Sequence, residues 1–194
     1  NPFLLDEPQA TNLVKDSGNL RGGNWQKAQA GVTVVLSSVL SPNGVDFSEL
    51  LNVNASSGNI FTRQSAGSST QASSNSVFVK KNNTRYFAIR NSGGGGLHDV
   101  FDFDTETFTN NSGNTLSFQS FPNGYYRIFV VNLGGISTDL ISFFPAINTS
   151  GVENTSVLIN IGVYIWGAQR ELTNTVSSFI PTTNAAATRN ADVI

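Results

Sequence analysis

The chain contains no cysteine and no methionine, and its single histidine is His98. Without cysteine it forms no disulfide, no thiolate metal site and no cysteine nucleophile. A single histidine excludes multi-histidine metal sites and most Ser-His-Asp triads, and we expect this one to be a surface residue beside the glycine tract at 93–96. No apolar run approaches the roughly 18 residues that suggest a membrane-spanning helix. These absences argue against an enzyme and against membrane insertion.

Charge is also scarce, because Asp, Glu, Lys and Arg make up 12% of the chain and the net charge is −2 at pH 7. A typical domain carries about twice that share of charged residues. The chain therefore lacks the basic surface that attracts nucleic acid or anionic membranes, and we expect neither as a partner. Its polarity comes from asparagine, serine, threonine and 18 glycines, a composition typical of turn-rich β-structure.

Alternation with a period of two dominates, and no segment of about 11 residues or more shows helical periodicity. Strands are predicted over 31–40, 99–109, 115–121, 125–133, 139–148 and 155–169, and a hairpin over 77–91. Turns rich in Asn, Gly and Ser separate them. The pattern predicts an all-β fold with one domain over 1–194, a single β-sandwich of jelly-roll type with about 9–10 antiparallel strands.

Three segments fall outside this alternation. Residues 1–30 are expected to be an irregular N-terminal segment, and 62–76, which has few large apolar residues, a long exposed loop. Residues 179–194 are expected to run as an extended C-terminal segment, because Ile180 precedes Pro181 and is thereby kept out of helical geometry.

One acidic pair could have a chemical role. In the segment 99–109, Asp102 and Asp104 alternate with Phe101 and Phe103 and lie roughly 7 Å apart on one strand face. Such a pair could bind a hard cation such as calcium, or serve as glycosidase carboxylates. Alternation alone already explains the pair as a solvated face, which is the favoured interpretation. We expect no cofactor, with calcium at Asp102 and Asp104 as the alternative.

Aromatic side chains are the candidates for binding sugar. Trp25, Tyr125 and Tyr164 could stack on sugar rings, and Trp25, in a polar segment, is predicted to be partly exposed. The alternative is that these rings belong to the core or to contacts between subunits. Phe143, Phe144 and Phe179 are the candidates for such a subunit interface.

The segment 164–193, YIWGAQRELTNTVSSFIPTTNAAATRNADV, resembles a motif at the end of sandwich domains in bacteriophage virion proteins. The resemblance rests on Trp166, Gly167, Ala168, Gln169, Glu171, Ser178, Ile180, Pro181, Thr182, Thr188, Arg189, Ala191, Asp192 and Val193. The segments 7–27, 41–51, 77–90, 99–109 and 121–130 match the family's pattern in the same order. Phe179, Arg170 and Glu106 depart from it.

The resemblance implies a jelly-roll module, related to carbohydrate-binding modules, of a tail fibre, tailspike or capsid fibre. It implies a homotrimer on the virion surface, among other virion proteins, with host-surface polysaccharide as a candidate ligand. The favoured hypothesis is a displayed domain that binds host or environmental glycan without cleaving it. The alternative is a structural domain that trimerises or decorates a fibre or capsid and binds no sugar. A depolymerase is the weakest hypothesis, because the sequence shows no convincing acid–base pair.

Overall fold

The computed structural model describes residues 7–55, 57–66, 70–91, 97–134, 140–155, 157 and 159–192. The glycine tract at 93–96 and Val193 lie outside these residues. The described part is built from strands, with one short 3-10 turn at Pro122–Gly124. None of it forms a helix long and apolar enough to cross a membrane. The predicted all-β class is confirmed.

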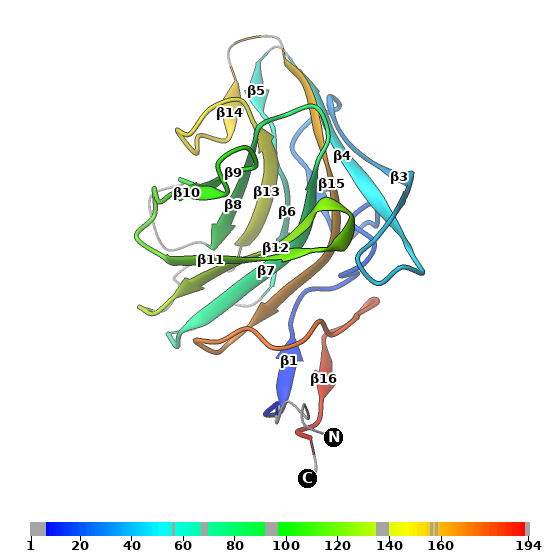
Figure 1. Cartoon of the computed structure of the whole chain (residues 1–194), viewed down its shortest axis with the longest axis vertical. Helices are drawn as coiled ribbons and strands as arrows, with labels where there is room; N and C mark the ends of the chain where they lie inside the picture. Colours follow the sequence, from blue (N-terminus) through cyan, green and yellow to red (C-terminus); the bar gives the residue numbers. More distant parts are fainter. Residues whose placement is uncertain are drawn as a thin grey trace.

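Two six-stranded sheets face each other as a sandwich (Figure 1). The first, which we call the β7 sheet, contains in spatial order β11 (Thr115–Phe121), β12 (Tyr125–Asn132), β7 (Ser73–Lys81), β15 (Ile159–Glu171), β4 (Phe47–Ala55) and β3 (Val32–Leu40). The second, the β8 sheet, contains β10 (Thr107–Thr109), β9 (Asp99–Asp102), β8 (Tyr86–Asn91), β13 (Leu140–Ala146), β6 (Thr62–Ser65) and β2 (Gln26–Lys27). Two short pairs lie apart from them: β1 (Ala10–Asn12) with β16 (Ala187–Arg189), and β5 (Gly58–Asn59) with β14 (Asn154–Thr155).

The strand order identifies a jelly roll. Along the chain, the central strands of the two sheets are β4, β6, β7, β8, β9, β12, β13 and β15. The outermost pair in this series is β4 with β15, followed by β6 with β13, β7 with β12, and finally β8 with β9. Successive pairs alternate between the sheets, and every pair is antiparallel, which is the nested arrangement of an eight-stranded jelly roll. The structure has more strands than the about 9–10 predicted, because short edge strands such as β2 and β10 add to the number. A strand of two or three residues is too short to show periodicity in the sequence.

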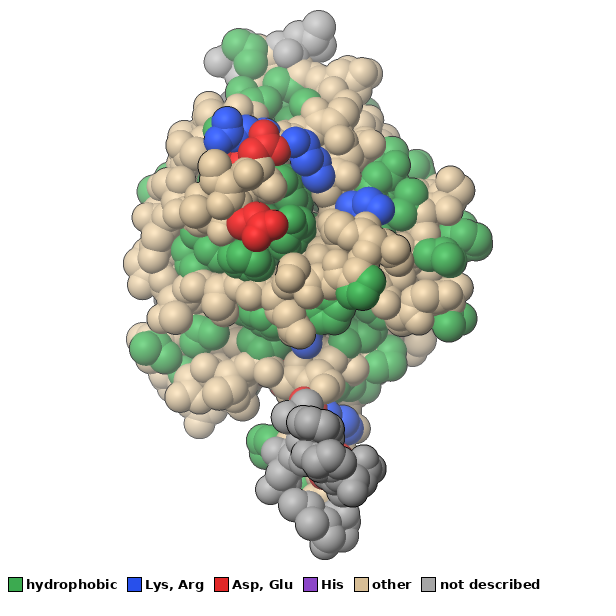
Figure 2. Space-filling model, viewed as in Figure 1, with side chains coloured by type: hydrophobic (Ala, Val, Ile, Leu, Met, Phe, Trp, Pro, Cys, Tyr) green, Lys and Arg blue, Asp and Glu red, His purple; other side chains and the backbone are tan. Residues whose placement is uncertain are grey.

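Alternation along each strand divides the core from the outer faces. On β12, Ile128 and Val130 are fully buried between the sheets. Arg127 and Phe129 lie on the opposite, outer face of the β7 sheet, because successive side chains of a strand point to opposite sides. Figure 2 shows that uncharged polar side chains and backbone cover much of one side of the molecule, in keeping with the low charge of the sequence.

Three local predictions are wrong. The segment 99–109 is not one strand, because β9 ends at Asp102, residues 103–106 form a turn and β10 begins at Thr107, so Asp104 does not share a strand face with Asp102. Residues 62–76 are not a long exposed loop, because β6 occupies Thr62–Ser65 and β7 begins at Ser73, with residues 67–69 outside the described part. The side chains of 73–76 are buried on both sides of β7: Asn75 Nδ2 donates to the Arg90 carbonyl on β8 at 3.3 Å, whereas Ser74 Oγ donates to the Thr175 carbonyl of the segment that crosses the outer face at 2.8 Å. Residues 77–91 are not a hairpin, because β7 and β8 belong to opposite sheets.

Strand β15 continues through Glu171 rather than ending at Gln169 as predicted. Its pairing with β7 shifts register between Trp166 and Gln169, which marks a β-bulge. Gly167 lies in this bulge with φ of 67°, and a Cβ there would approach Phe78 Cδ2 to 2.9 Å. Glycine is therefore required at 167 both by the backbone and by the neighbouring ring.

Candidate functional site

A trough runs along strands β11 and β12 on the outer face of the β7 sheet. Three hollows, of about 320, 350 and 380 Å³, follow one another along this strand pair. Thr115 and Val131 line both the first and the second hollow, and Phe129 and Val176 line both the second and the third. We call the three together the β11–β12 trough. Each hollow falls in the size range of ligand pockets.

One wall of the trough is the outer face of β11 and β12, and the other is the segment 174–179 that follows β15. Figure 1 draws this segment in orange, passing below β7 on its way to β16. Hydrogen bonds hold it in place: Gln169 Oε1 accepts from the Ile180 amide at 2.7 Å, and Gln169 Nε2 donates to the Ser178 carbonyl at 3.3 Å. The Glu171 carboxylate accepts from the Ser177 amide at 3.0 Å and the Ser177 hydroxyl at 2.7 Å. The second wall is therefore fixed to the sheet.

The N-terminal segment braces this wall from behind. The Glu7 carboxylate accepts a hydrogen bond from Ser178 Oγ at 2.7 Å and forms an ion pair with Arg189. Thr182 Oγ1 donates to the Val14 carbonyl at 2.6 Å. Gln169, Glu171, Ser178, Ile180, Thr182 and Arg189 all belong to the motif singled out in the sequence. Several residues of that motif thus attach the C-terminal segment to the sandwich.

Arg127 lies in the hollow of about 380 Å³, where it is 7% exposed. Its guanidinium lies between two rings, 5.1 Å from the centroid of Phe78 and 5.3 Å from that of Phe129. Nη2 donates to Ser76 Oγ at 3.0 Å, whereas Nε is buried and has no hydrogen-bond partner among the described residues. Burial lowers the pKa of Arg127 to about 10, and the negative charge of Glu171 acts in the opposite direction. The side chain is therefore a desolvated cation at neutral pH.

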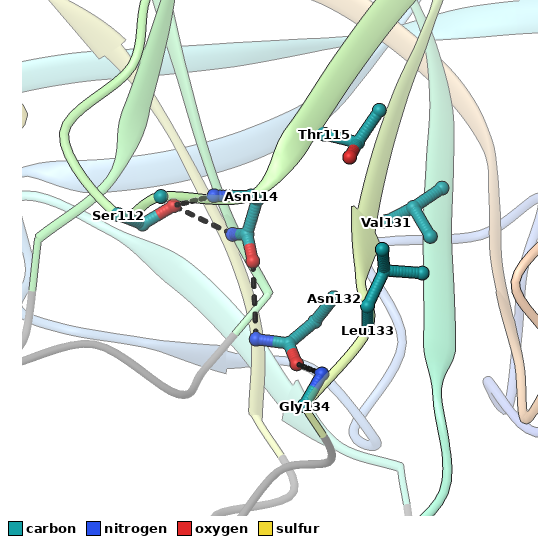
Figure 3. A pocket seen from close by; sticks show the side chains of 8 residues that line it. Ser112, Asn114, Thr115, Val131, Asn132, Leu133 and Gly134 are labelled. Carbon is teal, nitrogen blue, oxygen red and sulfur yellow. Dashed lines mark hydrogen bonds between the residues drawn. The ribbon is translucent and has the colours of Figure 1, made fainter.

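The opposite end of the trough is lined by amides and a hydroxyl in fixed orientations (Figure 3). Asn114 Oδ1 accepts from Asn132 Nδ2 at 3.1 Å, and Asn114 Nδ2 donates to Ser112 Oγ at 2.6 Å. The backbone amide of Gly134 donates to Asn132 Oδ1 at 3.0 Å. Behind them the fully buried Asp99 carboxylate accepts from Asn114 Nδ2 at 3.1 Å and from the Ser112 amide at 3.0 Å. This network fixes which amide atoms face the hollow.

The trough thus combines three kinds of surface. Apolar contact comes from Phe129 and Val176 at its centre, and hydroxyl and amide groups line the end that contains Asn114 and Asn132. The other end holds the buried cation of Arg127. Such a surface can stack on a ring and hydrogen-bond to hydroxyl groups, which is the chemistry of a sugar chain.

The predicted sugar-stacking residues are not in the trough. Trp25 is 2% exposed, against Phe143 at a centroid distance of 5.7 Å, so the prediction of partial exposure is wrong. Its Nε1 donates to the Asp16 carbonyl at 3.2 Å, which lets the indole be buried in spite of its polar neighbours in sequence. Tyr125 is fully buried, and Tyr164 packs half-buried in the same small cluster, which also contains Phe78 and Trp166.

Two of the three predicted subunit-interface residues are buried, and the third is half-buried. Phe143 and Phe144 are buried in the chain's own core, so they are not available to a second copy. Phe179 is half-buried, packs against Trp166 at 4.6 Å between centroids, and lines the hollow that contains Arg127.

The prediction that His98 lies on the surface is wrong, because His98 is fully buried, with Nε2 3.0 Å from Ser142 Oγ.

The two acidic candidates contact cations of the protein itself. Asp102 accepts from Arg85 through two nitrogens, at 2.9 Å from Nε to Oδ1 and 2.7 Å from Nη2 to Oδ2. These hydrogen bonds hold the pKa of the Asp102 carboxyl well below its usual range. Asp104 pairs with Lys81. No group of three or more His, Asp or Glu side chains that could hold a metal ion occurs in the described part of the chain.

Of the predicted site residues only Phe179 lines the trough, and Arg127 and Phe129 are the most informative of the lining residues that the sequence predictions left out. The signal was present in the strand 125–133, where alternation places Tyr125, Arg127 and Phe129 on one face. An arginine between aromatic residues on a strand face marks a candidate binding surface. Only the position of 174–179 turns that face into a trough.

Comparison with known proteins finds similarity at the level of structure. No family model matches the chain, and no curated protein matches it. Among solved structures, it is similar to the enzymatically active domain of bacteriophage CBA120 tailspike protein 4, with a TM-score of 0.47 and 18% sequence identity. The match covers 84% of this chain and 21% of that one, so the chain spans about a fifth of the matched structure. A likeness of this degree bears on neither ligand nor activity.

Proposed function

We propose that this chain is a bacteriophage virion-surface domain that binds host or environmental glycan in the β11–β12 trough without cleaving it. The observation that carries the proposal is the trough itself, an elongated depression with an apolar centre and polar ends. Six residue steps separate Thr115 from Phe121 on β11, which corresponds to about 20 Å of strand. This length suits a chain-like ligand better than a small metabolite.

The sequence motif supports the virion assignment. The motif resembles that of phage virion sandwich domains, and its residues Gln169, Glu171 and Ser178 hold one wall of the trough. These residues of the motif therefore build the scaffold of the trough, whereas the ligand is decided by the exposed residues that line it.

Binding without cleavage is proposed because the trough lacks a pair of free carboxylates. Its lining within the described residues includes one carboxylate, that of Glu7, which is paired with Arg189. The nearby Glu171 is 1% exposed and bonded to Ser177. Glycoside hydrolysis in most families needs two carboxyl groups on either side of the scissile bond.

A glycan array probed with the purified chain tests the proposal. We expect binding to at least one bacterial surface polysaccharide, and loss of that binding in Phe129→Ala, which removes the ring at the centre of the trough. Ile147→Ala is the control, because Ile147 is 44% exposed directly after β13 in the other sheet, away from the trough residues. A folded chain that binds no polysaccharide on the array would contradict glycan binding.

The alternative function is a structural one, in which copies of the chain join as a homotrimer and bind no sugar. It is favoured by exposed apolar residues on β3 and β4: Val35, Leu36, Leu40, Val45 and Phe47 are between 45% and 79% exposed. Figure 2 shows hydrophobic side chains at the right-hand edge, where Figure 1 draws these strands. Strand β3 is the edge of its sheet, and an unprotected apolar edge is suited to pairing with another copy.

Light scattering tests whether the exposed apolar surface on β3 and β4 joins the copies. We expect Leu36→Asp to lower the measured mass from trimer toward monomer, whereas Val152→Asp, at a similarly exposed position (48% against 52%), leaves it unchanged. A trimer that resists Leu36→Asp would exclude this surface as the interface. A trimer that binds no glycan would favour the structural role.

A further inference from the structure

We propose that the trough selects a glycan that carries carboxylate groups, and that Arg127 binds one such carboxylate. This inference rests on the proposed glycan binding and specifies its ligand class. The ligand meant is an acidic polysaccharide whose sugars include uronic or nonulosonic acids, each with one carboxylate per residue.

The first argument is that the protein leaves the guanidinium of Arg127 incompletely satisfied. An arginine offers five N–H donors, and a buried one is normally matched by a carboxylate or several acceptors. Among the described residues Arg127 donates to Ser76 Oγ, its Nε has no partner, and no carboxylate forms an ion pair with it. A buried, unpartnered donor that lines a hollow points to an acceptor supplied from outside.

The second argument is that the nearest internal acid is committed elsewhere. Glu171 is the carboxylate that acts electrostatically on Arg127, yet its oxygens accept from Gln169 Nε2 at 3.0 Å and from the amide and hydroxyl of Ser177. Those bonds hold the wall of the trough. A structural ion pair between Arg127 and Glu171 would have saturated both groups, and this arrangement instead keeps the guanidinium available to a ligand.

The third argument is that the guanidinium is already positioned. The rings of Phe78 and Phe129 lie 5.1 and 5.3 Å from it, and Ser76 fixes one nitrogen. An arginine held in this way loses little conformational entropy when it binds a planar acceptor. Gln119 lies opposite Arg127 in the strand register and is exposed, so its amide can contact neighbouring hydroxyl groups. Arginine and carboxylate match each other in bidentate geometry.

The charge around the site favours a carboxylate over a phosphate or a densely sulfated chain. Glu7 lines the same hollow and Glu171 lies close to it, so Arg127 presents one cation near two carboxylates. A dianionic phosphate monoester would be repelled by both acids, and closely spaced phosphodiester or sulfate groups would bring more negative charge near them than a single carboxylate does. Carboxylates spaced by neutral sugar surface also suit the apolar centre of the trough.

The test uses calorimetric titration of the whole chain with oligogalacturonate, oligosialate and their methyl esters, alongside dextran, polyglycerol phosphate and dextran sulfate. We expect one free acid to bind, and its methyl ester to bind about 10- to 100-fold more weakly, the range expected for a charge-assisted hydrogen bond. Arg127→Gln should weaken the free acid by the same factor, and Arg127→Lys should restore part of the affinity. Arg63→Gln, which removes an arginine over the ring of Phe61 on the other sheet, should change nothing.

The outcomes separate this inference from the proposed function. Equal binding of acid and ester, selective binding of the phosphate or sulfate polymer, or a dextran complex unaffected by Arg127→Gln would overturn the carboxylate inference while glycan binding stands. Absence of binding to every probe, together with a negative glycan array, would overturn both. The ester comparison uses the unaltered chain, so it decides the matter even if a variant at 127 fails to fold.

Discussion

The bulge at Gly167 gives the sharpest prediction for stability. Gly167 has φ of 67°, and an added Cβ would lie 2.9 Å from Phe78 Cδ2 and 3.3 Å from Phe179 Cε2. Both rings line the hollow that contains Arg127. Replacing this glycine by alanine therefore strains the backbone and forces apart the two rings at one end of the trough.

The magnitude follows from two separate contributions. A left-handed backbone conformation costs an L-residue about 1–2 kcal/mol. Overpacking against side chains in a tight cluster costs about 1–3 kcal/mol. The atoms that the new Cβ would contact are ring carbons of Phe78 and Phe179. The two rings pack against each other and against Trp166, so neither can move far to make room. We expect Gly167→Ala to lower the free energy of unfolding by about 2–5 kcal/mol, a large share of the 5–15 kcal/mol of a typical domain.

Urea unfolding followed by fluorescence measures these changes, and alanine variants at two other glycines separate the backbone contribution from the packing contribution. Gly44 has φ of 72° and no heavy atom within 4 Å of an added Cβ, so Gly44→Ala should show the backbone part alone. Gly23 also has open space and no positive φ, so Gly23→Ala should stay within about 0.5 kcal/mol of the parent chain. The dependence on denaturant should keep its slope. If Gly167→Ala proved no more destabilising than Gly44→Ala, the packing argument at the bulge would be refuted.

Three further predictions concern the wall and the acidic pair. Gln169→Leu leaves the Ile180 amide without its acceptor at 2.7 Å, and should destabilise the chain by about 1–3 kcal/mol and expose 174–179 to limited proteolysis; an unchanged digestion pattern would contradict the anchoring role. Because the pKa of Asp102 is lowered in the folded chain, its pair with Arg85 stabilises the fold above about pH 4, and this contribution is lost as pH falls through the folded-state pKa. The difference in unfolding free energy between the parent and Asp102→Asn should therefore shrink on acidification. A difference that grows would contradict this reasoning. Calcium or EDTA should leave the melting temperature unchanged, because Arg85 and Lys81 already engage Asp102 and Asp104, and a reproducible rise with calcium would show a site after all.

The candidate site could be predicted only in part. The sequence predicts the strand 125–133, and alternation along it puts Arg127 and Phe129 on one face, but neither residue is among the predicted site residues. The same alternation placed Tyr125 beside them, yet Tyr125 is fully buried while Phe129 is only half-buried. Periodicity gives the face of a residue, but the chain that crosses that face decides its exposure. Residues distant in sequence, at 174–179, made that decision.

The sequence by itself determined the fold class and the chemistry that is excluded. Period-two alternation between Asn- and Gly-rich turns suffices for an all-β sandwich, because side-chain direction along a strand is a local property. The lack of cysteine and the single histidine exclude whole classes of site regardless of folding. Pairing, burial and the trough belong to the tertiary structure. Trp25 can be buried because its indole N–H donates to the Asp16 carbonyl. Arg127 lines a hollow because Gln169 and Glu171 hold the segment 174–179 beside it. Such contacts join residues that are distant in sequence, so no periodic pattern in the sequence predicts them.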